Sequence, residues 1–394
     1  MTQPPFPPGP PRNPQQPGPW PPPRERPFGP PPTASSWPAP QGPPVVPPYT
    51  PTTPYGAAPP AAPPAEAAGR DGVPYHLLLR AGWHGTWWRG LIGIVCLGIG
   101  MVLVLPLIMM VPFVIYYVAT GADVPSSIST LVDLTDPTPA SLAYLNLSLA
   151  GLIPLTWVLV RWLHGLRPRW LSSIRPRLRW GYLLACFGLS FVALLATVLV
   201  ASLLPTVGAA GDVTGKLNEF TPEIRDFVLV VLLLTPLQAA AEEYAFRGYL
   251  LQAFGGIFGQ LGEGLKAPWL RHPVFAVVLS SFLFALAHGA GQDIPIFFDR
   301  FAFGIVAATL VVVTGGLEAG IAMHVLNNWL AFGAALAYGD MGSALNPTGG
   351  TWWSIPVTLT QSLVYLGLAW WVARAMGIKR RTDPAVLAAP ETRV

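Results

Sequence analysis

FVLVVLLLTPLQAAAEEYAFRGYLLQAF, residues 227–254, is an apolar run that carries two adjacent carboxylates, Glu242 and Glu243, with Arg247 as their only charged companion. A helix needs about 20 predominantly apolar residues to cross a bilayer, so this run is long enough to do so. An ionisable side chain near the middle of the bilayer costs about 3 kcal/mol on insertion scales, and such residues face a cavity, a partner or a functional site. The stretch therefore predicts a membrane-spanning helix that carries chemistry.

The rest of the chain has the composition of a multi-pass membrane protein. Of its 394 residues, 52% are apolar and 11% are charged, whereas soluble proteins have about 25% charged residues. Repeated apolar runs satisfy their backbone groups in lipid only as helices, so the predicted fold class is all-α, with the lipid bilayer as its surroundings. Eight spans are expected, the sixth of them short, at residues 91–118, 141–163, 180–204, 227–254, 273–290, 300–314, 317–337 and 354–377.

The first 70 residues form a separate region, because they hold 28 of the 47 prolines. Proline removes backbone donors, and the segment has too little apolar surface to offset the entropy of ordering, so residues 1–70 are predicted to be a disordered tail. A plain tether is the favoured interpretation, and a ligand for a proline-binding module, through runs such as PPFPPGPP at residues 4–11, is the alternative. Residues 75–90 mix Leu and Trp with Arg, which indicates an interfacial amphipathic segment.

Charge in the short loops predicts the orientation, since Arg and Lys favour the cytoplasmic side. Residues 161–179 hold six arginines and no acid, residues 378–394 form a short basic tail, and residues 119–140 hold three aspartates and no base. Eight spans then place both termini in the cytoplasm. The net charge of +4 is too small and too scattered to predict nucleic-acid binding. Two cysteines, Cys96 and Cys186, exclude a disulfide framework and a Cys-based metal site.

The two acids of the opening stretch are expected to differ in role. Residues four apart share a helix face, so Glu243 and Arg247 can pair while Glu242 points elsewhere and is free to accept a proton. The alternative is a buried structural ion pair with a spare acid near the headgroups.

Two later spans carry one histidine each. In SSFLFALAHGAG, residues 280–291, the four-residue spacing aligns Phe284 with His288, and in EAGIAMHVLNNW, residues 318–329, it aligns His324 with Asn328. Imidazole nitrogen can bind zinc, and an amide can bind a metal through its oxygen or hydrogen-bond a tetrahedral intermediate. One such histidine is more often structural, and Phe alone indicates packing. Two histidines with an intramembrane glutamate indicate metal-assisted peptide hydrolysis.

Small residues continue the His324 face of its predicted helix. Gly316 and Gly320 precede His324 at four-residue steps. This small-xxx-small pattern lets membrane helices approach closely, so the His324 face is expected to contact a neighbouring helix.

The order of three motifs resembles a known family, the CPBP intramembrane metalloproteases, which include CAAX prenyl endopeptidases and bacteriocin-processing or immunity proteins. The motifs are EExxxR at Glu242, Glu243 and Arg247, FxxxH at Phe284 and His288, and HxxxN at His324 and Asn328. The resemblance covers about residues 180–377, and the first two spans with their basic loop, 91–179, lie outside it. It implies an eight-helix core around a cavity in the membrane.

The resemblance also implies roles for these positions. Glu242 would be the general base, and His288, His324 and Asn328 the remaining catalytic positions, with structural support from Glu243, Arg247 and Phe284. His288 and His324, with Asn328 as a further ligand, would hold a divalent metal, with zinc the first choice. A glutamate-dependent mechanism without metal is the alternative within the family.

Three functions stay open. The first is a protease that cuts a membrane-associated or lipidated peptide, and the second is a non-catalytic scaffold or bacteriocin-immunity protein with the same fold. The third, a proton-coupled transporter with Glu and His as a relay, is less favoured because the halves of the chain show no convincing inverted repeat. Replacing Glu242 separates the first two, since a scaffold should keep its effect.

Overall fold

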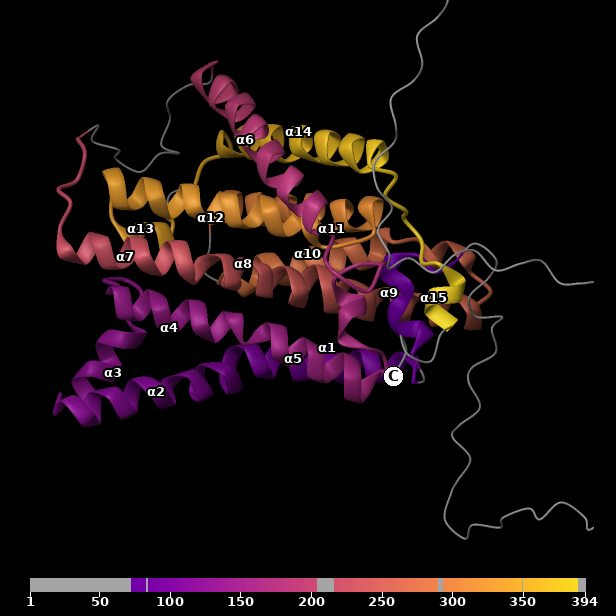
Figure 1. The fold of residues 1–394 in the computed structure, drawn as a ribbon, viewed down its shortest axis with the longest axis horizontal. Coiled ribbons are helices and arrows are strands. Elements are labelled where there is room, and N and C mark those ends of the chain that lie inside the picture. The colour runs from indigo at the N-terminus through magenta and orange to yellow at the C-terminus, as the bar shows by residue number, and fades with distance from the viewer. Residues whose placement is uncertain (1–71, 83, 204–215, 290–292, 349, 389–394) are drawn as a thin grey trace, which may run out of the picture. The chain divides into compact units, whose positions relative to one another are not determined.

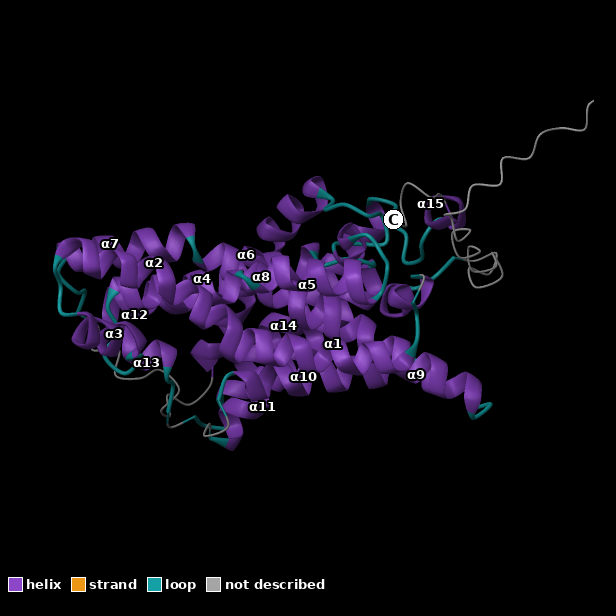
Figure 2. Ribbon diagram, turned by 90° about the horizontal axis from the view of Figure 1, so that it is seen from below, coloured by secondary structure: helices purple, strands orange, loops and turns teal. Residues whose placement is uncertain are grey.

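The computed structural model describes residues 72–82, 84–203, 216–289, 293–348 and 350–388. The tail predicted for residues 1–70 lies outside these ranges. Within them the backbone forms helices joined by loops and two isolated β-bridges, and no strand (Figure 2). The predicted all-α class is therefore confirmed.

The α-helices and the shorter π and 3-10 segments follow one another along the chain (Figure 1). The α-helices are α1 Trp87–Ile99, α2 Leu105–Thr120, α3 Val124–Val132, α4 Pro139–Ala150, α5 Leu152–Val158, α6 Trp180–Leu203, α7 Pro222–Leu233, α8 Thr235–Glu242, α9 Leu251–Gly264, α10 Val274–Ala287, α11 Ile294–Thr314, α12 Glu318–Tyr338, α13 Met341–Leu345, α14 Ser354–Ala375 and α15 Pro384–Ala388. The π-helical segments are η3 Gly100–Val104, η4 Leu159–Leu163 and η6 Glu243–Leu250, and the 3-10 helices are η2 Tyr75–Ala81, η5 Pro168–Leu171 and η7 Pro268–Arg271.

Seven helical runs in the described residues are long and apolar enough to cross a membrane. They coincide with seven of the eight expected spans: Trp87–Thr120, Pro139–Leu163, Trp180–Val200, Pro222–Gly264, Ile294–Thr314, Glu318–Tyr338 and Ile355–Ala375. Large apolar side chains on their outer faces are exposed, for example Val102 on η3 and Leu195 on α6. Since such faces are stable in lipid, the protein is an integral membrane protein.

The sequence had suggested a short sixth span, but the sixth, α11, has full length, and the fifth expected span, α10, is the apolar helix that falls short of the seven candidate spans. α10 has 14 residues, whereas α11 begins at Ile294 and has 21. The expected start at residue 300 was wrong because Asp299 and Arg300 look like a loop boundary but lie inside α11. Their buried atoms Asp299 Oδ1 and Arg300 Nε have no hydrogen-bond partner among the described residues.

The most enclosed part of the molecule is the junction of η6 with α12. All eight residues of η6 are buried, and so are the first nine residues of α12. In Figure 1, α7 and α8 run beside α12, with which both are in contact. α12 also packs against α6 and α11, and α10 packs against α11 and α9. The two acids and His324 thus lie where the protein, and not lipid, surrounds them.

A buried ion pair fixes the first turn of α12. Arg179 donates to Glu318 through its backbone N and its Nε, both at 2.8 Å, and through Nη2 at 2.5 Å. Its Nη1 also donates to the carbonyl of Thr314 at 2.9 Å. A bidentate Arg–carboxylate pair is a strong and directional contact. It therefore joins the basic loop before α6 to the turn between α11 and α12.

The interfacial segment predicted for residues 75–90 is divided in the structure. Tyr75–Ala81 forms η2, most of whose side chains are buried against α9, while Trp87 and Trp88 begin α1. Gly255 of α9 leaves room for the backbone carbonyl of His76, which a Cβ there would overlap. η2 is therefore part of the packed structure and does not lie freely at the interface.

Candidate active site

The candidate site begins at a change of helix type. α8 ends at Glu242, and the π-helical segment η6 begins at Glu243. π-helical turns inside α-helices are rare and occur often at functional sites. Glu243 and Arg247 still face each other, with Oε1 and Nη1 3.0 Å apart and both side chains fully enclosed. Glu243 is therefore held by an ion pair, as its spacing predicted.

Glu243 also contacts His324 across the helix interface. The His324 Nδ1–H donates to Glu243 Oε1 at 3.0 Å. This contact depends on Gly320, one turn before His324, because a Cβ at that position would lie 2.5 Å from Glu243 Oε2. Because a carboxylate accepts from Nδ1, the proton of a neutral imidazole is on Nδ1, and Nε2 keeps its lone pair.

Glu242 lies on the other side of the same imidazole. Its Oε2 is 3.6 Å from His324 Nε2, is buried and has no hydrogen-bond partner among the described residues. Its Oε1 accepts a hydrogen bond from Gln238 Nε2. Gln238 in turn accepts from Asn328 Nδ2 at 3.0 Å, so one amide joins Glu242 to Asn328. Glu242 is thus held by one oxygen and directed at His324 by the other.

His288 reaches the site from the end of α10. It is the C-cap of that helix, and its Nδ1–H donates to the carbonyl of Phe284 at 2.8 Å. This hydrogen bond leaves Nε2 of a neutral His288 with its lone pair, as in His324. Fourteen helical residues rise about 21 Å, less than the roughly 30 Å of the hydrocarbon core. α10 is therefore shorter than the hydrocarbon core is thick, and His288 lies at its C-terminal end.

Phe284 connects the histidines and the arginine. Its ring centroid is 4.6 Å from that of His288 and 6.0 Å from that of His324. The Arg247 guanidinium carbon lies 3.8 Å from the centre of the same ring, a cation–π contact. Phe284 therefore packs between Arg247 and the two histidines.

The structure brings together all seven residues predicted for the site, in one connected set of contacts. In the described residues no three His, Cys, Asp or Glu side chains are grouped closely enough to hold a metal ion. The donor chemistry nevertheless fits a divalent cation. Two neutral imidazoles keep Nε2 lone pairs, and Glu242 Oε2 has no hydrogen-bond partner among the described residues. The two carboxylates, of Glu242 and Glu243, are matched by one guanidinium, that of Arg247, which leaves negative charge that a cation would balance.

Sequence reasoning missed three contributors to this site. Gln238 joins Glu242 to Asn328, the ring of Phe303 lies 5.5 Å from that of His324, and Glu318 anchors α12. For Gln238 a signal existed, because it is the only amide in the apolar run before Glu242 and lies four residues from it. Phe303 and Glu318 depend on tertiary packing, for which the sequence carries no local signal.

Fold and site together define a multi-pass membrane protein with a buried Glu–His–Asn centre. Residues 224–330 match the family model for type II CAAX prenyl endopeptidases, described as Rce1-like. This range contains all three motifs, so the part of the chain that carries the candidate site is the part that resembles this family.

Two curated relatives match part of the chain. The chain is 32% identical over 115 residues to the membrane-embedded CAAX protease MroQ of Staphylococcus aureus, covering 29% of this chain and 41% of the relative. It is 29% identical over 150 residues to the uncharacterized protein YyaK of Bacillus subtilis, covering 36% of this chain and 46% of the relative. The chain thus spans less than half the length of either relative. No solved structure matches it.

Proposed function

We propose that the chain is an intramembrane endopeptidase that hydrolyses a peptide bond of a membrane-associated or lipidated peptide. The observation that carries this proposal is the arrangement of Glu242 and His324, whose Oε2 and Nε2 are buried 3.6 Å apart while Gln238 and Glu243 hold their other ends. The family match of residues 224–330 and the relative named as a CAAX protease support it.

In this mechanism Glu242 is the general base. It takes a proton from the attacking water, and the water oxygen forms a bond to the peptide carbonyl carbon. Glu242 then gives the proton to the leaving amine as the carbon–nitrogen bond breaks. Asn328, held by Gln238, hydrogen-bonds the oxyanion of the tetrahedral intermediate through an N–H. Glu243 keeps His324 in one orientation and one tautomer.

His288 and His324, with Asn328 as a further ligand, are the residues that would hold a divalent metal, with zinc our first choice. Such an ion lowers the pKa of a bound water towards neutrality. Metal content of the purified full chain tests this separately from activity. Near-stoichiometric zinc that is lost in folded His288→Ala and His324→Ala variants is expected, and retention of zinc in both would refute the assignment.

We also propose that both termini face the cytoplasm. The basic residues 161–179 and the C-terminal basic tail lie at the same end of the helices, because Arg179 contacts Thr314 and the carbonyl of Lys379 lies against Gly315. Cysteines introduced at Arg175 and at Lys379, in a variant lacking Cys96 and Cys186, should resist a membrane-impermeant thiol reagent in whole cells. Labelling of either cysteine from outside the cell would show that the orientation is the opposite of the one proposed.

The activity itself is tested by reconstituting the full chain in liposomes with a mixture of membrane-anchored peptides and detecting products by mass spectrometry. Wild-type protein should release new fragments, and Glu242→Gln should release none. A Cys96→Ser variant, changed at an exposed position on α1, is the matched control and should cut as wild type does. Equal cleavage by Glu242→Gln would rule out Glu242 as the base. A cellular effect that survives Glu242→Ala would favour the scaffold or immunity function.

A further inference from the structure

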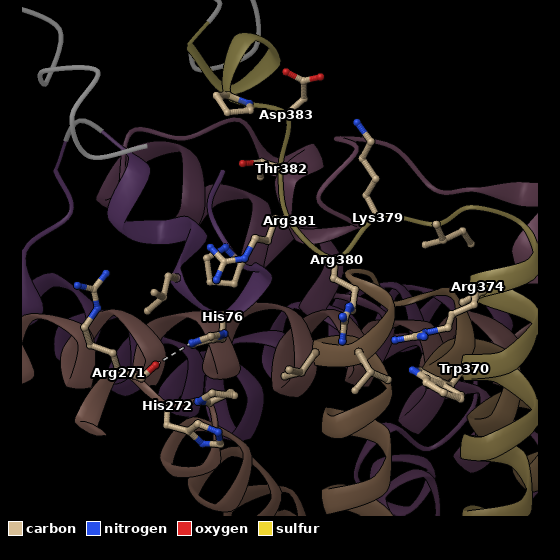
Figure 3. Close-up of a pocket in the computed structure, with 18 of the residues that line it drawn as sticks. His76, Arg271, His272, Trp370, Arg374, Lys379, Arg380, Arg381, Thr382 and Asp383 are labelled. Atoms are coloured by element: carbon tan, nitrogen blue, oxygen red, sulfur yellow. Dashed lines mark hydrogen bonds between the residues drawn. The ribbon is translucent and has the colours of Figure 1, made fainter. Parts of the chain in front are cut away.

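One hollow in the described residues contains none of the residues of the candidate active site. It has a volume of about 1430 Å³ and lies among η2, η7, the ends of α11 and α14, and the C-terminal segment that follows α14 (Figure 3). Its volume is large enough for a ligand of moderate size. Nothing in the proposed peptide hydrolysis uses it.

The lining of this cavity is basic. It includes five arginine and lysine side chains and two histidines, against one acid, Asp383. The basic residues are His76, Arg271, His272, Arg374, Lys379, Arg380 and Arg381. Figure 3 shows the side chains of Arg374 and Arg380 extending into the same space from α14 and from the C-terminal segment.

Most of this positive charge has no acidic partner. Arg271 has an exposed contact with Glu263 at 3.5 Å. Among the ion pairs of the described residues, none involves Arg374, Lys379, Arg380 or Arg381. Like charges gathered around one concavity produce a positive potential that concentrates anions. The cavity is therefore suited to an anionic ligand.

The segment that carries Lys379, Arg380 and Arg381 is hydrogen-bonded to the residues before η2. The backbone N–H of Val73 donates to Thr382 Oγ1 at 2.9 Å, and that of Thr382 donates to the carbonyl of Val73 at 3.0 Å. Arg381 Nη1 donates to the carbonyl of Gly72 at 3.1 Å. The C-terminal segment is thus held directly against residues 72–74, beside the cavity. A basic tail whose only role was to fix the orientation in the membrane would not need these contacts.

The cavity also lies at the level where helices leave the membrane. α11 and α14 end at it and α10 begins beside it. Trp269 and Trp370 line it, and the Arg374 guanidinium carbon lies 4.4 Å from the centre of the Trp370 ring. Tryptophan is enriched at the headgroup level of membranes. Anionic phospholipids carry a phosphate at this level of a bilayer, so such a lipid could reach the cavity with its charged group.

We propose that this cavity binds the phosphate group of an anionic phospholipid, with Arg374 and Arg380 as its main ligands. Basic pockets between membrane helices on the cytoplasmic side recognise acidic headgroups in this way. A soluble phosphate compound shares the chemistry and differs in its source. This site is independent of the peptidase function proposed for Glu242 and can be tested without a substrate.

The test measures the thermal unfolding of the full chain in a neutral detergent. Phosphatidylglycerol should raise the midpoint in a saturable manner, phosphatidylcholine should not, and high salt should reduce the effect. In Arg374→Gln/Arg380→Gln the apparent affinity for phosphatidylglycerol should fall by roughly 30-fold, since each basic side chain near a membrane surface contributes about fivefold. The same measurement with inorganic phosphate at millimolar concentration, in place of the lipid, tests whether a soluble phosphate compound is the source.

A matched control removes two charges from the same end of the molecule but outside the cavity. Arg175→Gln/Arg177→Gln, at exposed positions in the loop before α6, should keep the full response to phosphatidylglycerol. An equal loss in both double variants, or no loss in either, would overturn the proposal. If inorganic phosphate alone gives the whole stabilisation, the source is a soluble phosphate compound and the lipid assignment is wrong. Should Arg374→Gln/Arg380→Gln not fold, Lys379→Gln decides, with a smaller loss expected and an unchanged affinity refuting the site.

Discussion

Arg247 is the residue whose removal should cost the fold most. Its guanidinium is fully enclosed, 3.0 Å from Glu243 and stacked on Phe284. Arg247→Met would leave the Glu243 carboxylate buried with no cation partner, and breaking a buried pair costs about 3–5 kcal/mol. Unfolding of the purified variant in detergent should show this loss of stability together with a loss of activity.

Glu242→Gln is the contrasting change, and it should leave the unfolding midpoint nearly unaltered. A glutamine keeps an oxygen for the hydrogen bond from Gln238 and has the same volume as glutamate. Activity should vanish because an amide cannot take the proton from water. If Glu242→Gln unfolds the protein, the two acids do not have the separate roles assigned to them.

Gln238 should act on activity through the residues it holds. Gln238→Leu removes the contacts with Glu242 and Asn328 together, and loss of such an outer partner lowers activity by about 10- to 100-fold. The fall should appear in kcat and not in KM. The control is Gln361→Leu, which removes a 2.7 Å hydrogen bond to Asn327, the neighbour of Asn328 on α12. A similar loss in both variants would mean that Gln238 matters only for packing.

At the scale of the helix, replacing two glycines of α12 by alanine tests whether α12 must approach η6 closely. In Gly320→Ala the new Cβ would lie 2.5 Å from Glu243 Oε2, so either the Glu243 carboxylate or the two helices must shift, at a cost of about 1–3 kcal/mol. In Gly333→Ala, on the same helix, the Cβ meets nothing within 4 Å, so stability should hold or rise slightly. Unfolding midpoints of the two variants measure the difference. Equal behaviour would show that close approach at Gly320 is not needed.

The elements also show which features of the fold and of the site can be predicted from the sequence. Apolar length predicted the helices, and four-residue spacing predicted the Glu243–Arg247 contact, because both are local properties of one chain segment. The start predicted for α11, at residue 300, was wrong because the charged pair Asp299 and Arg300 inside the helix resembles a loop when its surroundings are unknown. The π-helical register of η6 and the partner of His324 arise between segments distant in sequence. Local spacing therefore gave the candidate residues but not the way they are oriented.

At the scale of the whole molecule, two buried histidines outside the spans predict how stability depends on pH. Burial lowers the pKa of His76 and the pKa of His164, each to about 4 from an ordinary value of 6.5. Both are therefore neutral in the folded chain, where His76 bonds the carbonyl of Arg271 and His164 bonds Tyr249. Between pH 6.5 and 4 the unfolded chain binds more protons than the folded one, so stability falls as the pH falls.

The expected slope is about 1.4 kcal/mol per pH unit for each histidine within that window. His76→Gln should remove about one histidine's share of the slope, because a glutamine does not titrate. Unfolding in detergent from pH 7.5 to 4.5, in buffers free of phosphate so that the basic cavity stays unliganded, measures the wild type and the variant. A slope that His76→Gln does not alter would show that His76 is not kept neutral by folding, and that η2 is less firmly packed against α9 than its burial indicates.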